Sequence, residues 1–369
     1  MNIRFKMPVS IIMQENCVFR EANSFAGYGK NAILIADRTA AAESGALYDV
    51  DSALKRSGIS YTPYISERDT FSLEYILTIA AEARESGADM VVAVGGGHLI
   101  DAGKAVAFIA AQQGVISEAD LKEGRLCPNH LPLIVIPTHA GTGAEVSPSS
   151  IVTGSSGEEI ICDTVPVYAS LALIDPGYSL TVPMSVFVSS VFEQLGDIIE
   201  IYTSKSETAR FMKPIVRDCL LNLYVIFSAI GEDQVDNSVR ELKIHTGIQT
   251  GIVVTQTGIS AFYELAYQVS SILHISHGEA VNLLLIPYLQ LIKNKQPDLA
   301  NSLINTYGVA DLNKLEAFFA DTHLSPRHIR RLSQLEMETL SDKVASSKRI
   351  HNSLIVPSKK EIAHILEQI

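Results

Sequence analysis

The segment Met90–Phe108, MVVAVGGGHLIDAGKAVAF, constrains the fold of this chain more than any other segment. An apolar run, Val91–Val94, is followed by the three glycines Gly95, Gly96 and Gly97 and then by a stretch of helical periodicity. Glycines let the backbone approach a ligand because they carry no Cβ. The N–H groups and the dipole at the start of the next helix favour phosphate oxygens. The order of strand, glycine turn and helix therefore predicts a site for the pyrophosphate of a dinucleotide.

The first half of the chain alternates short apolar runs with stretches of helical periodicity. Alternating strands and helices of these lengths predict a parallel sheet with helices on both faces. The expected strands are 32–36, 90–94, 133–136, 151–153 and 171–174, and the expected helices are 71–86 and 100–112.

The pattern changes after Pro183, where strand signals nearly vanish and apolar residues recur at helical spacing. With 369 residues the chain is too long for one ordinary core, so we expect two domains. The boundary at 181–183 gives an α/β domain over 1–183 and an all-helical domain over 184–369. A cleft between two domains is a natural place for a ligand. The expected helices of the second domain are 186–203, 214–230, 238–273, 279–294 and 312–322.

The composition of the chain argues against several classes of partner. The net charge of −12 disfavours nucleic acid and anionic membrane surfaces. The N-terminus lacks the features of a secretion signal, and no apolar run reaches about 18 residues without polar interruption. The four cysteines are scattered and form no CxxC pair, which indicates a reduced, cytoplasmic setting. The hydrophobic content of 47% permits a homodimer.

Four motifs occur in the order in which a known enzyme family carries them. They are GGGHLIDAGK at 95–104, PTHAGTGAEV at 137–146, IDP at 174–176 with LTVP at 180–183, and SHGEAVNLLLIP at 276–287. On these motifs the chain resembles the iron-containing alcohol dehydrogenase family over about residues 25–369. The resemblance implies a Rossmann-like NAD(P)-binding domain and a helical catalytic domain, a fold similar to that of dehydroquinate synthase. It also implies hydride transfer between a small alcohol and an aldehyde or ketone.

The resemblance further implies roles for residues of the first two motifs. The glycines would hold the pyrophosphate, while Asp101, in the first turn of the next helix, and Lys104 would face the nicotinamide end or its ribose. Thr138 and Thr142 would bring hydroxyls to the adenine and ribose. The structural alternative is that Asp101 only favours the helix N-terminus and that the glycines beside Thr142 only make a turn. The cofactor-binding candidates are Asp37, Gly95, Gly96, Gly97, His98, Asp101, Lys104, Thr138, His139 and Thr142.

Asp37 ends an expected strand and bears on the choice of cofactor. A carboxylate there accepts hydrogen bonds from the adenosine ribose and repels a 2′-phosphate. Arg38 beside it could instead attract a phosphate, and the pair could form a simple turn. We expect NAD, with NADP left open.

The metal site of the family is largely replaced in this chain. The resemblance implies one Asp and three His as ligands, and here Glu193, Asp197 and Tyr263 take three of these positions. Only His277 is kept. Glu193, Asp197 and His277 could form a set resembling non-haem iron or zinc sites, since the two acids share one helical face. The structural alternative is that the two acids only lie on a solvated helix face. Because a phenol must ionise before it binds a divalent ion, we favour a site without the usual iron or zinc.

Tyr263, Tyr267 and His277 are the catalytic candidates for proton transfer. The tyrosines are four residues apart on one expected helix, and Tyr267 takes the position of a family His that assists proton transfer. His277 opens an expected helix and carries an imidazole suited to acid–base chemistry. Both tyrosines could instead belong to the core.

Three other hypotheses stand beside a metal-independent NAD(P)-linked oxidoreductase. One is a metal-dependent dehydrogenase with the rewired ligands Glu193, Asp197 and His277. Another is a degenerate nucleotide-binding fold that serves as a subunit or regulator. The last is cyclase chemistry like that of dehydroquinate synthase, which needs two His ligands that we do not find in this sequence. Fold alone does not decide among them.

Overall fold

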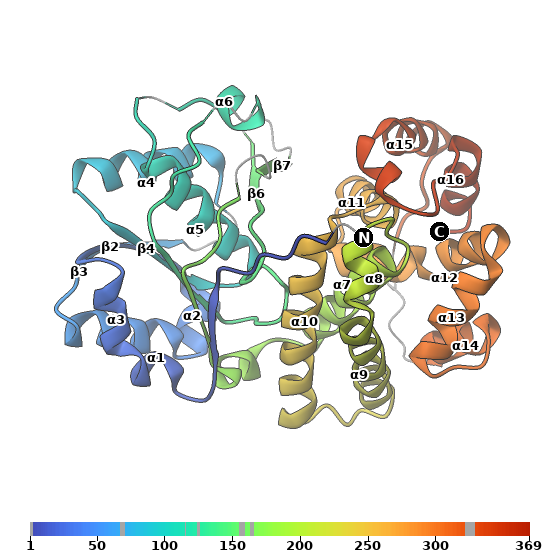
Figure 1. Cartoon of the computed structure of the whole chain (residues 1–369), viewed down its shortest axis with the longest axis horizontal. Coiled ribbons are helices and arrows are strands. Elements are labelled where there is room, and N and C mark those ends of the chain that lie inside the picture. The colour runs from blue at the N-terminus through green and yellow to red at the C-terminus, as the bar shows by residue number, and fades with distance from the viewer. Residues whose placement is uncertain are drawn as a thin grey trace. The chain divides into compact units, whose positions relative to one another are not determined.

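The computed structural model describes residues 3–66, 71–114, 116–123, 126–154, 159–162, 166–321 and 329–369. The chain divides into two compact units, which Figure 1 draws from blue to red along the chain. One is an α/β unit, Met7–Val182, and the other is a helical unit, Pro183–Ile369. The helical unit also takes in the N-terminal residues up to Lys6. The main chain of Lys6 exchanges two hydrogen bonds of 2.9 Å with the Gln256 side chain there.

Parallel strands form the sheet of the α/β unit, which confirms the expected fold class. Among the described residues its six strands lie in the order β1 (Ser10–Met13), β8 (Leu171–Ile174), β5 (Leu133–Pro137), β4 (Met90–Gly95), β2 (Asn31–Asp37) and β3 (Ser60–Ser66). Its helices are α1 (Cys17–Arg20), α2 (Arg38–Glu43), α3 (Ala46–Arg56), α4 (Leu73–Glu85), α5 (Gly97–Ala110) and α6 (Glu118–Glu123). Figure 1 shows α4 and α5 on one face of the sheet and α1 and α3 on the other. A parallel sheet needs such cover on both faces.

The side chains of β4 divide between the two faces by the two-residue period of a strand. Val92 and Val94 belong to the core that includes α1 and α3, whereas Ala93 faces α5. A Cβ added at Gly103 of α5 would lie 2.6 Å from the Cβ of Ala93. Gly103 therefore sets how closely α5 docks on the sheet, and with it the position of the helix N-terminus.

Two strands of the main sheet and strand β7 were not expected from the sequence, and one expected strand lies outside the main sheet. Strands β1 and β3 are edge strands whose residues are exposed or half-buried, so they lack the continuous apolar run of a central parallel strand. The expected strand 151–153 is β6 (Ser150–Thr153). It pairs antiparallel with β7 (Glu159–Cys162) in a separate two-stranded sheet.

The helical unit is built around α7, which packs against α9, α10, α11 and α12. Two glycines bring α12 close to α7: a Cβ at Gly278 would lie 1.9 Å from the Ser189 carbonyl oxygen, and one at Gly196 would lie 2.9 Å from Val281. These contacts fix the start of α12 on α7. The described helices of this unit are α7 (Met184–Tyr202), α8 (Glu207–Phe211), α9 (Lys213–Gly231), α10 (Asn237–Thr257), α11 (Ala261–Leu273), α12 (His277–Lys295), α13 (Pro297–Tyr307), α14 (Leu312–Asp321), α15 (Gln334–Ser346) and α16 (Lys359–Leu366).

The expectation of one continuous helix over 238–273 is wrong, because the chain breaks between α10 and α11. Gly258 has a φ of +75°, a conformation that glycine adopts at little cost, and it ends α10. Helix α11 begins three residues later, at Ala261. The apolar pattern continues across the break because both helices bury side chains in the same unit.

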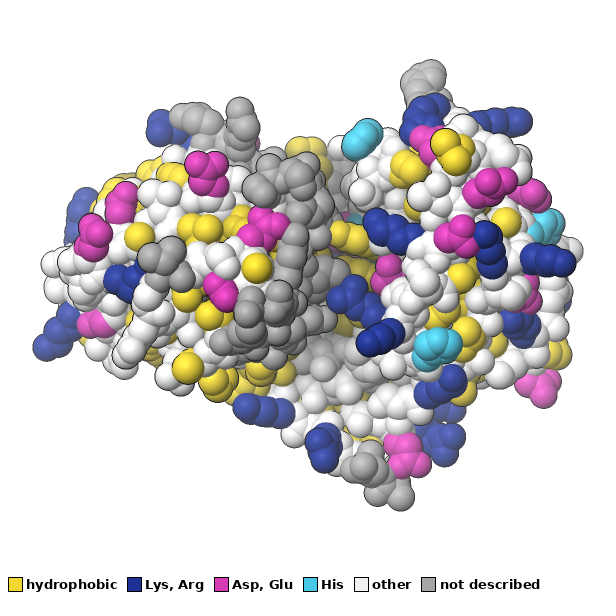
Figure 2. Space-filling model, turned by 90° about the horizontal axis from the view of Figure 1, so that it is seen from above, with side chains coloured by type: hydrophobic (Ala, Val, Ile, Leu, Met, Phe, Trp, Pro, Cys, Tyr) yellow, Lys and Arg dark blue, Asp and Glu magenta, His cyan; other side chains and the backbone are white. Residues whose placement is uncertain are grey.

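The surface mixes both signs of charge with some apolar side chains. On the face that Figure 2 draws, Lys and Arg as well as Asp and Glu are spread over both units. Leu221 and Val225 of α9 are exposed, while Leu220 and Phe227 of the same helix are buried. Among the described helices, α9 is the one long and apolar enough to cross a membrane on length and composition. A buried core helix can pass the same test, so this finding is weak evidence for a membrane span.

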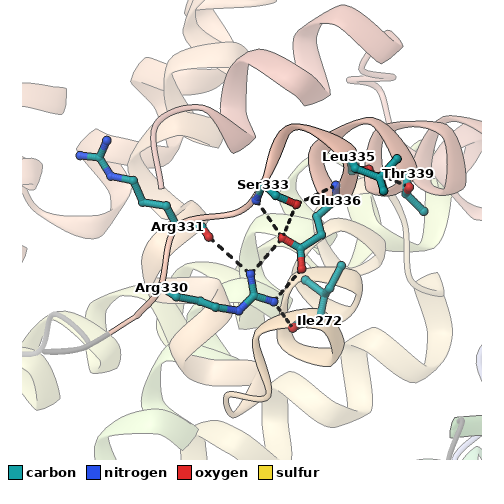
Figure 3. A network of polar contacts seen from close by, with 7 residues as sticks. All are labelled: Ile272, Arg330, Arg331, Ser333, Leu335, Glu336 and Thr339. Carbon is teal, nitrogen blue, oxygen red and sulfur yellow. Dashed lines mark hydrogen bonds and ion pairs between the residues drawn. The ribbon is translucent and has the colours of Figure 1, made fainter.

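A polar network joins the segment before α15 to the end of α11 (Figure 3). The Arg330 guanidinium donates to both carboxylate oxygens of Glu336, at 2.9 and 2.7 Å, and to the Ile272 carbonyl at 3.2 Å. Glu336 also closes a capping box with Ser333 at the start of α15. Arg330 is exposed, so the network orients α15 on α11 more than it stabilises the unit.

Candidate functional site

Asp37 and Gly95 end the neighbouring strands β2 and β4 at the carboxyl edge of the sheet. The strand order reverses here, because β3 lies on one side of β2 and β4 on the other. Open parallel sheets bind ligands at such a switch point. A Cβ added at Gly95 would lie 2.6 Å from an Asp37 carboxylate oxygen and 2.5 Å from Leu99. A side chain at position 95 would therefore force both neighbours to move.

The Asp37 carboxylate already has one structural task, since it caps helix α2. One of its oxygens accepts hydrogen bonds from the N–H groups of Ala40 and Ala41, at 2.5 and 3.1 Å. The other oxygen lies toward Gly95. The side chain is buried, so a ribose contact would use a carboxylate that the cap holds in place. That contact stays a prediction.

Helix α5 begins directly after β4, with Gly96 as its N-cap. The first N–H groups of a helix have no partner within it, and a Cβ at Gly96 would meet nothing within 4 Å. At Gly97 a Cβ would lie 3.3 Å from the Thr142 hydroxyl. His98 is exposed on the first turn. Because the helix starts at residue 97, Asp101 lies in its second turn and the expectation of the first turn is wrong.

The loop after β5 lies beside this helix start. The Thr138 N–H donates to the Gly95 carbonyl at 3.0 Å. The Thr138 hydroxyl is buried and has no hydrogen-bond partner among the described residues. A buried polar atom without a partner costs free energy, so a ligand with a donor or acceptor would be favoured here. The start of a helix and this hydroxyl fit a dinucleotide. Beside Thr138, His139 is half-buried.

Glu145, in the same loop, was missed by the sequence analysis. One of its carboxylate oxygens accepts from the Gly141 N–H at 2.8 Å, across a turn in which Gly141 and Gly143 have φ values of +81° and +84°. Its other oxygen is buried without a partner among the described residues. The sequence feature that could have revealed it is that Glu145 is the one acidic residue of the motif at 137–146.

Lys104 is fully buried, which differs from the expectation that it faces a cofactor. Its ammonium pairs with Asp101 at 3.0 Å and donates to the Ser149 carbonyl at 2.8 Å. The second carboxylate oxygen of Asp101 accepts from the Ile151 N–H at 3.1 Å. These contacts fasten α5 to β6 and the residues before it. The pair therefore has a structural role, and its contact with a cofactor stays a prediction.

The three candidates for proton transfer come together in the helical unit. The ring of Tyr263 lies 4.6 Å from the His277 imidazole, centroid to centroid, with 41° between their planes. It lies 6.5 Å from the ring of Tyr267, and those planes differ by 8°. Both tyrosines are half-buried on one face of α11, as their spacing predicts. His274, three residues before His277, is exposed and ends α11 in the left-handed conformation, with a φ of +54°.

His277 is the first residue of α12, as expected, and lies between the two members of a capping box, Ser276 and Glu279. The Ser276 hydroxyl also lies 2.8 Å from that of Ser189 on α7. Burial lowers the pKa of His277 to about 4, since desolvation disfavours the charged imidazole. The ring is therefore neutral near pH 7, with one nitrogen that donates a hydrogen bond and one that accepts.

Glu193 and Asp197 lie one turn apart on α7, and both are half-buried. Burial, together with the negative charges of Glu193 and Glu200, raises the pKa of Asp197 well above its ordinary value. In the part of the chain that the structure describes, no group of three His, Cys, Asp or Glu side chains is arranged to hold a metal ion. Glu193, Asp197 and His277 are therefore not brought together as a ligand set. The donor set present does not fit the metal of the family.

Glu200 is a second residue that the sequence analysis missed. Its carboxylate is buried on α7 and accepts hydrogen bonds from Ser260 and from the Tyr263 N–H. The sequence feature that could have revealed it is that Glu200 is a lone acid within the apolar run Ile198–Ile201. Such a residue is rarely buried unless it has partners.

A family model and a curated relative match this chain. Residues 8–176 match the family model named iron-containing alcohol dehydrogenase. The long-chain-alcohol dehydrogenase 1 of Geobacillus thermodenitrificans is 27% identical over 282 residues, which cover 74% of this chain and 71% of that protein.

Solved structures share the fold of both units. An iron-containing alcohol dehydrogenase from Thermotoga maritima matches with a TM-score of 0.89 and 23% identity, over 100% of this chain and 99% of that one. Sulfoacetaldehyde reductase from Bifidobacterium kashiwanohense, in complex with NAD+, matches with a TM-score of 0.85 and 21% identity, over 100% and 98%. The family-model match over residues 8–176 and the curated relative support membership of the iron-containing alcohol dehydrogenase family, and the names of the matched proteins are those of oxidoreductases.

Proposed function

We propose that this chain is an NAD-linked oxidoreductase that interconverts a small alcohol with an aldehyde or ketone, without the metal ion of its family. The observation that carries the proposal is the open start of α5 at Gly96, beside the buried, unpartnered hydroxyl of Thr138. This pair lies at the switch point of a parallel sheet, where dinucleotides bind. When bound, the nicotinamide would supply or accept the hydride. The family assignment supports the same chemistry.

Transfer of the proton to and from the substrate oxygen is assigned to the aromatic cluster of the helical unit, which consists of Tyr263, Tyr267 and His277. Reduction of a carbonyl needs a group that polarises its oxygen and then gives that oxygen a proton. The Tyr263 phenol can do both, and the neutral imidazole of His277 beside it can hydrogen-bond to the phenol or to the substrate. Tyr267, one turn along α11, extends the same cluster. This assignment replaces a Lewis acid because Tyr263, at a ligand position of the family's metal site, is a phenol, and phenols bind divalent ions poorly near neutral pH.

NAD is preferred over NADP because of Asp37. A 2′-phosphate at the carboxyl end of β2 would approach a buried carboxylate that the α2 cap holds in place. The repulsion between two negative groups favours the cofactor without that phosphate.

The test is a turnover assay with the purified full-length chain. Loss of the absorbance of NADH is followed with short aldehydes, ketones, a long-chain aldehyde and sulfoacetaldehyde, with and without a metal chelator, and then repeated with NADPH. We expect turnover with NADH that the chelator leaves unchanged. The same preparation, measured by light scattering, tests whether the chain forms a homodimer.

Three outcomes would contradict the proposal in different ways. Activity that the chelator abolishes and iron or zinc restores would mean that a metal is used. Tight NADH binding without turnover on any carbonyl compound would favour a nucleotide-binding subunit. A lack of NADH binding would remove the cofactor assignment itself.

A further inference from the structure

Helix α11 receives its N-terminal cap from another helix. Ser260 is its N-cap residue, yet the Ser260 side chain makes no capping hydrogen bond to α11. Instead its hydroxyl donates to one carboxylate oxygen of Glu200, and the Tyr263 N–H donates to the other. A carboxylate at this place satisfies the orphan donors of the first turn and interacts favourably with the helix dipole. Glu200 lies on α7, 60 residues before Ser260.

The burial of Glu200 shows that these contacts are specific. The residue is 1% exposed, and burial raises the pKa of its carboxyl to about 7 even though the hydrogen bonds from Ser260 and Tyr263 lower it. The titratable groups that interact electrostatically with Glu200 are Asp197 on its own helix and Tyr288 on α12, and the charge of Glu200 raises the pKa of both. A buried acid with this desolvation cost persists only where its oxygens are used. Here both oxygens hold the first turn of α11.

Because the chain breaks before α11, the orientation of this helix depends on tertiary contacts such as those with Glu200. Gly258 turns the chain out of α10, so the backbone of α10 does not continue into α11. Tyr263 is the third residue of α11, and its own N–H is one of the donors that Glu200 holds. The ring of the same residue lies against His277.

We propose that Glu200 is a positioning residue, which holds the Tyr263 ring against His277 by fixing the first turn of α11 on α7. Its effect on catalysis rests on the proposed function, whereas its effect on geometry does not. The experiment therefore reads the geometry directly.

The measurement is the NMR signal of the His277 ring in the full-length protein labelled at histidine. A ring at 4.6 Å shifts the signals of a neighbouring imidazole, so Tyr263→Leu defines the signal without the contact. His277→Gln assigns the signal. We compare Glu200→Ala, which removes both acceptors, with Glu200→Gln, which keeps an acceptor for the Tyr263 N–H. Glu264→Gln is the matched control, because Glu264 is a buried acid of α11 whose carboxylate contacts Gln268 and Arg349 and does not cap the helix.

We expect Glu200→Ala to move the His277 signal most of the way to its position in Tyr263→Leu. Glu200→Gln should restore most of the wild-type shift, and Glu264→Gln should leave it unchanged. A folded Glu200→Ala protein with an unmoved His277 signal would overturn the proposal and leave Glu200 a purely structural role.

If Glu200→Ala does not fold, Ser260→Ala takes its place. It removes the hydroxyl donor of Ser260 and should move the signal in the same direction by a smaller amount, and an unmoved signal would again overturn the proposal. In the turnover assay, Glu200→Ala should lower kcat and leave the KM for NADH nearly unchanged. A moved signal in a wild-type protein without turnover would mean that the proposed function fails while the positioning role stands.

Discussion

The ring of Tyr263 and the imidazole of His277 lie 4.6 Å apart although they come from two different helices, and both helices are fixed on α7. The start of α12 meets α7 at Gly278, and the start of α11 meets it at Glu200. One helix therefore sets the distance between the two groups that we assign to proton transfer.

Tyr263→Phe should keep the ring contact with His277 and remove only the phenol oxygen. We expect kcat to fall by about 10²–10⁴, the usual contribution of general acid catalysis, with little change in the affinity for NADH. Steady-state kinetics and an NADH titration measure the two effects. Tyr267→Phe is the control, and a larger loss of kcat in that variant would move the proton donor one turn along α11.

The stability of the helical unit should depend on pH in opposite ways through His277 and Glu200. The pKa of His277 falls from 6.5 to about 4 on folding, so its stabilising effect is complete above pH 6.5 and is lost as the pH falls through 4. The pKa of Glu200 rises from 4.5 to about 7, so its effect is complete below pH 4.5 and is lost as the pH rises through 7. Asp197 acts in the same direction as Glu200.

Urea unfolding at pH 4, 5, 6, 7 and 8 separates these two contributions. Relative to wild type, His277→Gln should gain about 3 kcal/mol of unfolding free energy between pH 7 and pH 4, since a pKa unit corresponds to about 1.4 kcal/mol. Glu200→Gln should gain a similar amount between pH 4 and pH 8. A constant difference between either variant and wild type across this range would show that the group does not titrate as described.

Gly95 and Gly96 should respond differently to substitution by alanine. Gly95→Ala forces a Cβ onto Asp37 and Leu99, so we expect about 1–3 kcal/mol lower stability. Gly96→Ala adds a Cβ in open space at an ordinary φ of −75°, so stability should change by less than about 0.5 kcal/mol. If the pyrophosphate lies on this turn, Gly96→Ala should still weaken NADH binding by about tenfold or more. Unchanged binding would place the pyrophosphate elsewhere.

The buried pair of Lys104 and Asp101 should matter for folding more than for turnover. Asp101→Asn leaves the Lys104 ammonium without its charged partner, and we expect a loss of about 3–5 kcal/mol in urea unfolding. Lys104→Met removes the ammonium and should lower the unfolding free energy by a smaller amount, because the Asp101 carboxylate still accepts the hydrogen bond from the Ile151 N–H. If the stability of Asp101→Asn matched wild type while its NADH affinity fell, the cofactor role expected from the sequence would be the correct one.

Much of the fold follows from the sequence because the central strands and long helices carry strong periodic patterns. Strands β4 and β5 are continuous apolar runs, and α7 and α12 have clear apolar faces. The edge strands β1 and β3 could not be found in this way, because their side chains are only partly buried. The break at Gly258 was hidden since buried residues recur on both sides of it.

For the candidate site, spacing placed side chains on common faces but could not assign their partners. The i, i+4 spacing brought Tyr263 and Tyr267 together, and the motif order placed His277 at a helix start. The same kind of reasoning could not foresee that Lys104 is paired inside the fold. Glu200 escaped notice because its partners lie about 60 residues away, a separation that periodicity does not register.

The cap that Glu200 lends to α11 has a consequence for the order in which the helical unit forms. A short helix without a local cap is marginal by itself in water. During folding, the first turn of α11 gains its acceptors only once α7 is already in place, so α11 should acquire amide protection with or after α7 in pulse-labelled hydrogen exchange. Earlier protection of α11 would contradict this order. In a chain synthesised from its N-terminus, α7 leaves the ribosome first, so the helix that α11 depends on is available when α11 emerges.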